Sequence, residues 1–198
     1  MKYIDKYFDA AKQLLDKIDK KDIKKILEIL VKVKEKNARL FIIGVGGGAG
    51  NAGHAVNDFR KIAGIETYAP TDNVSELTAR ANDDGWDSVF VSWLKTSKLS
   101  KDDCVFVFSV GGGDAQRKIS NNIVEALKYA KDVGSKIIGI VGRNGGFTAE
   151  VADAIVLIPV VNEDLTTPLT ESFQAVVWHL LVSHPLLKSN EMKWESIK

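Results

Sequence analysis

Residues 39–51 read RLFIIGVGGGAGN, and residues 103–114 read DCVFVFSVGGGD. Each segment is a short run of apolar, β-favouring residues that opens directly onto three consecutive glycines. Apolar residues at helical spacing follow both glycine triplets, so each segment indicates a strand, a tight turn and a helix. Two such units in one chain predict βαβ connections and a mostly parallel sheet with helices on both faces.

The rest of the chain supplies the other elements of this α/β architecture. Apolar spacing predicts two amphipathic helices before the first strand, at 3–17 and 21–36. The remaining strands are continuous apolar runs, as is typical where helices cover both faces of a sheet. Further strands are expected at 65–68, 136–141 and 154–159, and further helices at 74–81, 86–95, about 118–131 and about 169–183.

Bulk composition excludes several classes of protein. The 27 Lys and Arg residues nearly balance the 26 Asp and Glu residues, so no nucleic-acid or membrane-surface partner is expected. No apolar stretch approaches the roughly 20 residues that span a bilayer. The single cysteine, Cys104, lies in an apolar run, which predicts a buried strand thiol and a reducing, cytoplasmic location. We expect a single domain over 1–198, comprising N-terminal helices (1–37), a core (38–184) and a loosely ordered tail (185–198).

Both glycine triplets follow predicted strands, at the edge where open α/β sheets bind ligands. Glycines there allow close backbone approach, and the next helix offers free N–H groups to an anion. A phosphorylated small molecule is therefore the expected ligand, with simple tight turns as the alternative. GVGGGA at 44–49 also satisfies the dinucleotide fingerprint, with Glu66 about 20 residues on. That fingerprint needs neither the leading helices nor a second glycine turn, so we expect no nucleotide cofactor.

The order of these motifs resembles the phosphoheptose isomerase branch of the sugar-isomerase (SIS) family. That branch has two N-terminal helices, a strand followed by GNGGS, then TD…NDYGF, STSGNS, GRDGG and a last helix with Q…H. The matching pieces are GVGGG (44–48), TDNVSELTARANDDGW (71–86), SVGGGD (109–114), VGRNGG (141–146) and ESFQAVVWH (171–179). The resemblance covers roughly residues 3–184. It implies a three-layer, flavodoxin-like α/β/α sandwich with a five-stranded parallel sheet, and oligomers with active sites between subunits.

The resemblance also implies a metal site, usually for zinc, on the first helix after the glycine turn and on the last helix. The corresponding positions are His54, Asp58, Glu171 and His179. Independently of the family, His54 and Asp58 stand at i, i+4 on one helix face, a plausible half-site for zinc. Glu171 and His179 are about 12 Å apart along an ideal helix. They could share one ion only if Glu171 preceded the helix or another subunit contributed. Ordinary polar residues on half-buried helices are the alternative.

The phosphate clamp departs from the family pattern. The branch holds phosphate with the hydroxyls of GNGGS and STSGNS, and only Ser109 clearly survives here. Asp114 would repel a phosphate that lay against it. About five extra residues follow this turn and could bring Arg117 or Lys118 to the anion instead.

The resemblance implies an aldose–ketose isomerase that works through an enediol on a phosphorylated sugar, with zinc as candidate cofactor and a homodimer or homotetramer as its assembly. Asp58 and His179 are the candidate acid and base. Thr71, Asp72 and Asn82 would bind sugar hydroxyls or merely cap loops. The alternative function is a non-catalytic SIS-type module that binds a sugar phosphate or docks a protein. The predicted substrate contacts are Gly46, Gly47, Gly48, Asn51, Thr71, Asp72, Asn82, Ser109, Gly111, Gly112, Asp114 and Glu171.

Overall fold

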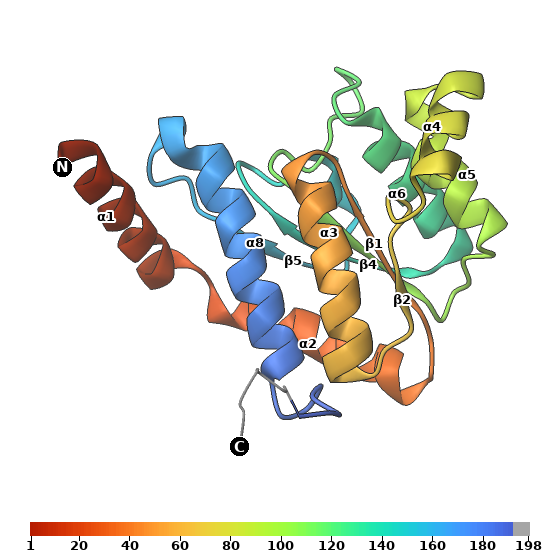
Figure 1. Ribbon diagram of the computed structural model, residues 1–198, viewed down its shortest axis with the longest axis horizontal. Coiled ribbons are helices and arrows are strands. Elements are labelled where there is room, and N and C mark those ends of the chain that lie inside the picture. Colours follow the sequence, from red (N-terminus) through yellow and green to blue (C-terminus); the bar gives the residue numbers. More distant parts are fainter. Residues whose placement is uncertain (192–198) are drawn as a thin grey trace.

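The continuous apolar runs form the five strands of one sheet in the computed structural model, which describes residues 1–191 (Figure 1). All neighbouring strands pair in parallel, in the order β2-β1-β3-β4-β5. Every residue of β1 is buried, as expected for a sheet covered on both faces. The predicted five-stranded α/β fold is confirmed. The strands are β1 (Leu40–Gly44), β2 (Thr67–Tyr68), β3 (Cys104–Ser109), β4 (Lys136–Val141) and β5 (Ala154–Leu157).

Helices cover the sheet on both sides (Figure 1). Successive side chains of β3 point to opposite faces, so Phe106 and Phe108 join the core beneath α2, α3 and α8. Val105 and Val107 join the second core, beneath α4 to α7. Within residues 1–191, no helix has the length and apolar character needed to cross a membrane. The helices are α1 (Lys2–Lys17), α2 (Lys20–Glu35), α3 (Gly47–Asp58), α4 (Val74–Asp83), α5 (Val89–Thr96), α6 (Asn121–Val133), α7 (Gly146–Val151) and α8 (Thr166–Ser183).

Helix α1 leans away from the sheet at the edge of the molecule (Figure 1). Of its apolar residues, Ala10 and Leu14 are buried against the body. Ile4, Phe8 and Leu15 are more than half exposed, at 53%, 61% and 55%. The two leading helices are therefore present as predicted, but most of the apolar stripe of α1 faces outward.

Helix α6 begins at Asn121, three residues later than predicted, because the preceding residues form a structure of their own. Asp114 and Ile119 pair as an isolated antiparallel bridge. Lys118 and Ser120 then adopt left-handed backbone conformations, with φ of 55° and 48°. A right-handed helix cannot start through these residues, so the extra residues form a small turn beside the second glycine triplet.

Helix α8 begins at Thr166, three residues earlier than predicted. Pro168 stands in its first turn, where a missing N–H leaves no helical hydrogen bond unmade. Glu171 consequently lies inside the helix rather than before it.

The predicted loose tail is wrong for the residues that follow α8. Leu187 is fully buried, and the backbone N–H groups of Ser189 and Asn190 both donate to the carbonyl of Ile62. Ile62 belongs to the π-helical turn Phe59–Ala63 that ends α3. The chain after α8 therefore packs back onto the end of α3. The rest of the predicted tail, 192–198, lies outside the described residues.

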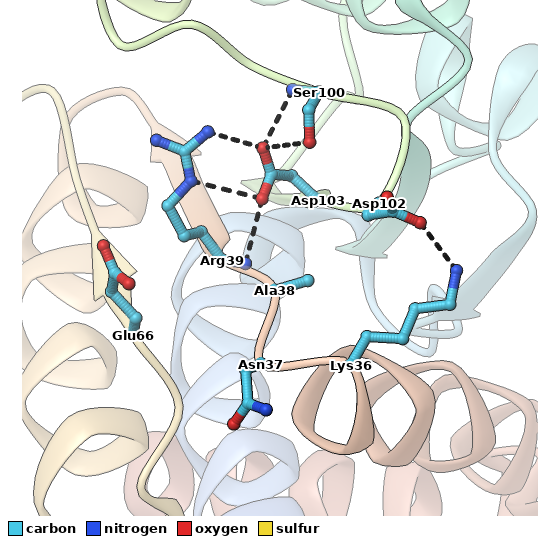
Figure 2. Close-up of a pocket in the computed structure, with 8 residues that line it drawn as sticks. All are labelled: Lys36, Asn37, Ala38, Arg39, Glu66, Ser100, Asp102 and Asp103. Atoms are coloured by element: carbon cyan, nitrogen blue, oxygen red, sulfur yellow. Dashed lines mark hydrogen bonds and ion pairs between the residues drawn. The ribbon is translucent and has the colours of Figure 1, made fainter.

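An ion-pair network joins the residues that precede β1 and β3, at the amino ends of these strands (Figure 2). Arg39 donates to both carboxylate oxygens of Asp103, from Nη2 at 2.7 Å and from Nε at 3.2 Å. Asp103 also accepts from the backbone N–H and hydroxyl of Ser100. Burial alone would raise the pKa of Asp103, but the hydrogen bonds from Arg39 and Ser100 outweigh it and hold that pKa below its usual value. These groups line a cavity of about 550 Å³, and their bonds to one another give the network a structural role.

Cys104 follows this network as the first residue of β3. Its side chain is fully buried, as predicted, and burial raises the pKa of its thiol.

Candidate functional site

The two glycine turns lie at one edge of the sheet because β1 and β3 are neighbours, with Gly44 paired to Phe108. Gly48 is buried, and a Cβ there would collide with the carbonyl of Phe108. Gly46 starts α3 with a positive φ of 59°. Packing of α3 against two strands thus accounts for Gly48, while Gly46 and Gly47 are the exposed members of the triplet.

Glu171 lies over the first glycine turn. A Cβ at Gly47 would collide with the Glu171 carboxylate, so this carboxylate rests directly against the glycine backbone. Asn51 fixes the same contact, since its Nδ2 donates to the backbone carbonyl of Glu171 at 3.0 Å and to Oε1 of Gln174 at 2.8 Å. Asn51, predicted to contact substrate, therefore joins α3 to α8, and Gln174 is a residue that the sequence did not indicate.

Three of the four predicted metal ligands meet where α3 and α8 lie side by side (Figure 1). Nε2 of His54 lies 3.5 Å from Oδ2 of Asp58, and Nε2 of His179 lies 3.3 Å from the same oxygen. One ligand atom from each of the three residues falls within 4.8 Å of the others. Asp58 is only 6% exposed, whereas both imidazoles are open to solvent. Glu171 is not in this cluster, because two helical turns of α8 separate it from His179.

Two further side chains hold Asp58. The indole Nε1 of Trp178 donates to Oδ2 at 3.1 Å, and Nδ2 of Asn57 donates to Oδ1 at 3.1 Å. Neither residue stood out in the sequence. Trp178 is adjacent to His179 in ESFQAVVWH, but only the packing of α8 on α3 brings its N–H to Asp58.

The tautomer of His179 decides what the cluster can bind. Its Nδ1 lies 2.8 Å from the backbone carbonyl of Ala175, which can only accept, so Nδ1 carries the proton. A neutral ring then directs the lone pair of Nε2 toward Oδ2 of Asp58, another acceptor. Two acceptor atoms at this separation fit a shared cation, and imidazole with carboxylate is a donor set suited to zinc.

The second glycine turn is built by its own side chains. The hydroxyl of Ser109 accepts from the N–H of Gly112 at 3.0 Å. Gly112 is buried, and a Cβ there would collide with the carbonyl of Gly145 in the neighbouring turn. Oδ1 of Asp114 accepts from the backbone N–H groups of residues 116 and 117. Asp114 therefore helps to fold the extra turn.

A groove of about 1120 Å³ opens beside this turn, at the carboxyl ends of β3, β4 and β5. Arg117 and Arg143 both line it, while Lys118 does not. Arg143 stands at a left-handed φ of 53° in the GRNGG turn. The other polar lining includes Asp114, Ser120, Glu150, Glu163, Thr166 and Thr167, and Gly111 contributes backbone.

The remaining predicted sugar contacts have local partners. Oδ2 of Asp72 accepts from the N–H of Ala69 at 3.3 Å, and Nδ2 of Asn82 donates to Asp83 at 2.7 Å. Asp72 also approaches α3, where a Cβ at Gly53 would lie 3.6 Å from its Oδ1. Thr71, half-buried, precedes it in the same turn. Asp72 and Thr71 thus lie near the helix that carries His54, and Asn82 is exposed on α4.

The dinucleotide alternative is wrong. Glu66 bonds through its carbonyl to the N–H of Leu40, the first residue of β1. Its side chain lines the cavity at the amino ends of the strands (Figure 2), on the opposite edge from the glycine turns. A ribose held by Glu66 could not reach a pyrophosphate on the first turn.

The sequence pattern of the SIS domain matches residues 6–142. The chain belongs to the SIS domain family. The lincomycin biosynthesis protein LmbN of Streptomyces lincolnensis is 31% identical over 152 residues, 71% of this chain, which spans about half (54%) of that relative. A probable phosphoheptose isomerase of Thermoplasma volcanium is 29% identical over 182 residues, covering 89% of this chain and 87% of that protein.

Solved structures share the fold. The phosphoheptose isomerase of Neisseria gonorrhoeae superimposes with a TM-score of 0.77 at 24% identity, over 91% of this chain and 96% of that one. Together with the sequence relatives, this likeness confirms the resemblance to the phosphoheptose isomerase branch of the SIS family.

Proposed function

We propose that this SIS-family chain is a phosphosugar aldose–ketose isomerase. The cluster of His54, Asp58 and His179 carries the proposal, because it brings acid–base groups together with both imidazoles open to solvent. Its sequence relative named as a probable phosphoheptose isomerase supports the substrate class.

The proposed chemistry moves one proton between adjacent carbons and another between their oxygens, through an enediol. We assign the acid and base roles to Asp58 and His179. His179 would accept or deliver a proton at Nε2, since Nδ1 is engaged by the Ala175 carbonyl. Asp58 would act through Oδ2, the oxygen that faces both imidazoles. In the alternative in which zinc is held by His54, Asp58 and His179, these atoms would be metal ligands instead of proton carriers, and the ion would supply Lewis-acid polarisation of the substrate carbonyl.

The groove beside the second glycine turn is the proposed phosphate site. Arg117 and Arg143 would donate hydrogen bonds to the phosphate in place of the missing hydroxyls of the clamp, and would add positive charge. Asp114 also lines this groove, but its Oδ1 accepts from two backbone N–H groups and its Oδ2 lies 3.7 Å from Nε of Arg117, which offsets its negative charge. Glu150 and Glu163, which also line the groove, would accept hydrogen bonds from sugar hydroxyls.

We infer that two copies of the chain complete the site. Thr167 in the groove and His179 in the cluster are twelve residues apart on α8, about 18 Å along the helix axis. That distance exceeds the length of an extended seven-carbon sugar phosphate, so the groove of one subunit would serve the cluster of another. The exposed apolar stripe of α1 offers surface for such an association.

The test is an NMR isomerisation assay on sedoheptulose 7-phosphate, with and without added zinc. We expect turnover by the wild type and a loss of at least about 100-fold in His179→Ala, as is typical when an acid–base group is removed. His184→Ala is the matched control, because His184 lies outside the cluster and bonds the N–H of Leu186. Its activity is expected to be unchanged.

Two results would contradict the proposal. Full activity in folded His179→Ala would remove this residue from the mechanism. Silence of the folded wild type on this and other phosphosugars would favour the non-catalytic binding module instead.

A further inference from the structure

Trp178 lies beneath the cluster of His54, Asp58 and His179 and contacts all three residues. The side chain is 1% exposed and stacks on Phe108, with ring centroids 5.6 Å apart and an interplanar angle of 17°. Its ring also meets the imidazole of His54 edge-on at 5.4 Å. Two successive residues of α8, Trp178 and His179, thus approach the Asp58 carboxylate from the buried side and the open side.

The indole bond has one chemical consequence. An indole N–H only donates, so Trp178 neither titrates nor ligates a metal, and its contact with Oδ2 can act only on the carboxylate. Asn57 holds the other oxygen in the same way. The bond from Trp178 is buried and therefore strong, because little water competes for the carboxylate there.

The length of the Asp58 side chain makes this restraint matter. The family resemblance implies Glu here, and Asp is one methylene shorter. A shorter carboxylate can adjust its reach toward His54 and His179 less. If the Asp58 carboxylate rotated away, the rest of the side chain could not compensate, so neighbours that hold the rotation matter more. Outer-sphere partners that orient a ligand typically change metal affinity by about 10- to 100-fold when removed.

We propose that Trp178 is a positioning residue: its indole N–H fixes Asp58 so that Oδ2 faces both histidines, and this orientation sets the affinity for a divalent cation. The inference rests on the proposed function, because it takes the cluster to be a metal site.

The experiment measures Co²⁺ binding to the full chain by calorimetry and by visible absorption. In Trp178→Phe we expect the affinity to fall about tenfold or more, with a changed Co²⁺ spectrum, because an aromatic ring remains but the donor is lost. Trp93→Phe is the matched control. Trp93 lies on α5, across the sheet, edge-on to Phe41. Its variant should bind Co²⁺ as the wild type does.

A second measurement uses the wild type and does not depend on whether Trp178→Phe folds. In the wild type, the indole N–H resonance of Trp178 should be protected from hydrogen exchange and should shift more than that of Trp93 when Zn²⁺ is added. If the indole N–H of Trp178 exchanged freely and its resonance did not shift on addition of Zn²⁺, the inference would be overturned.

The outcomes separate the two proposals. Equal Co²⁺ affinity and spectrum in the wild type and in folded Trp178→Phe would overturn the role of Trp178 alone. Failure of the wild type to bind Co²⁺ or Zn²⁺ would overturn the metal centre, and this inference with it.

Discussion

Two glycines of α3, only two residues apart, differ in whether the fold requires them. Gly48 is buried where α3 meets β3, and any side chain there would strike the Phe108 carbonyl. Gly50 is exposed, and a Cβ there would have nothing within 4 Å. The first is a requirement of packing, whereas the second weakens a helix for no structural gain.

We therefore expect Gly48→Ala to lower the free energy of unfolding by about 1–3 kcal/mol, the usual range for overpacking. Gly50→Ala should raise it by up to about 1 kcal/mol, because Ala is the better helix former. Urea denaturation of both variants beside the wild type measures the difference. Equal stabilities would mean that α3 can move away from β3 at no cost.

The sequence reveals individual site residues only where the signal is local. His54 and Asp58 are visible as an i, i+4 pair, and resemblance supplied His179. Trp178 escaped prediction because its role depends on the contact between α3 and α8, two helices far apart in the chain. Glu171 was misplaced for the same reason, since its carboxylate rests on Gly47 rather than in the cluster. Asn57 bonds its neighbour Asp58 within α3, and an Asn beside an Asp carries no sequence signal of its own.

At the scale of elements, the chain after α8 joins α8 to α3, the two helices that carry His54, Asp58 and His179. Its residues bond the carbonyls of the π-helical turn that directly follows Asp58. Oγ of Ser189 donates to the carbonyl of Ala63, and Nδ2 of Asn190 donates to that of Lys61. The end of α8 is thereby fixed to the end of α3, which stabilises the pairing that forms the cluster.

Neighbouring leucines test this docking. Leu187 is fully buried and Leu186 is 62% exposed. We expect Leu187→Ala to cost about 3 kcal/mol of unfolding free energy, in the range for buried leucines. Leu186→Ala should stay within about 0.5 kcal/mol of the wild type. Chemical denaturation measures both, and a silent Leu187→Ala would show that the segment is not docked in solution.

Most helices and strands were predictable, whereas several boundaries and the short π-helical and 3-10 turns were not. Continuous apolar runs located every strand, because both faces of the sheet are covered. The start of α6 was missed because the bridge from Asp114 to Ile119 leaves no trace in apolar spacing. The docking of Leu187 was missed because two adjacent leucines carry no periodicity that tells which of them is buried.

At the scale of the whole molecule, the Arg39 and Asp103 pair links folding to pH. The pKa of Asp103 is lowered in the fold, so its stabilising contribution is complete above its ordinary value of about 3.9. That contribution is lost as the pH falls through the lower, folded value. Asp102 next to it forms a surface pair with Lys36 at 2.7 Å and is half exposed.

We expect Asp103→Asn to lose about 3 kcal/mol at pH 7, because Arg39 keeps its charge without a partner. The gap to the wild type should narrow as the pH falls below about 4, because Asp103 of the unfolded chain becomes protonated there before Asp103 of the fold does. Asp102→Asn should lie within about 0.5 kcal/mol of the wild type, as is usual for exposed pairs. Urea titrations from pH 3 to 7 test this, and a gap that does not change with pH would contradict it.

The burial of Cys104 has a practical consequence. It is the sole cysteine of the chain, and it sits in a strand with neighbours on both sides. A thiol that is fully buried and has a raised pKa does not react with alkylating dyes while β3 stays in place. Labelling of Cys104 therefore reports opening of the sheet. When the dye is dilute enough that the sheet recloses faster than the thiol is labelled, the labelling rate measures the free energy of that opening. The protein thus carries its own stability probe without any engineered label.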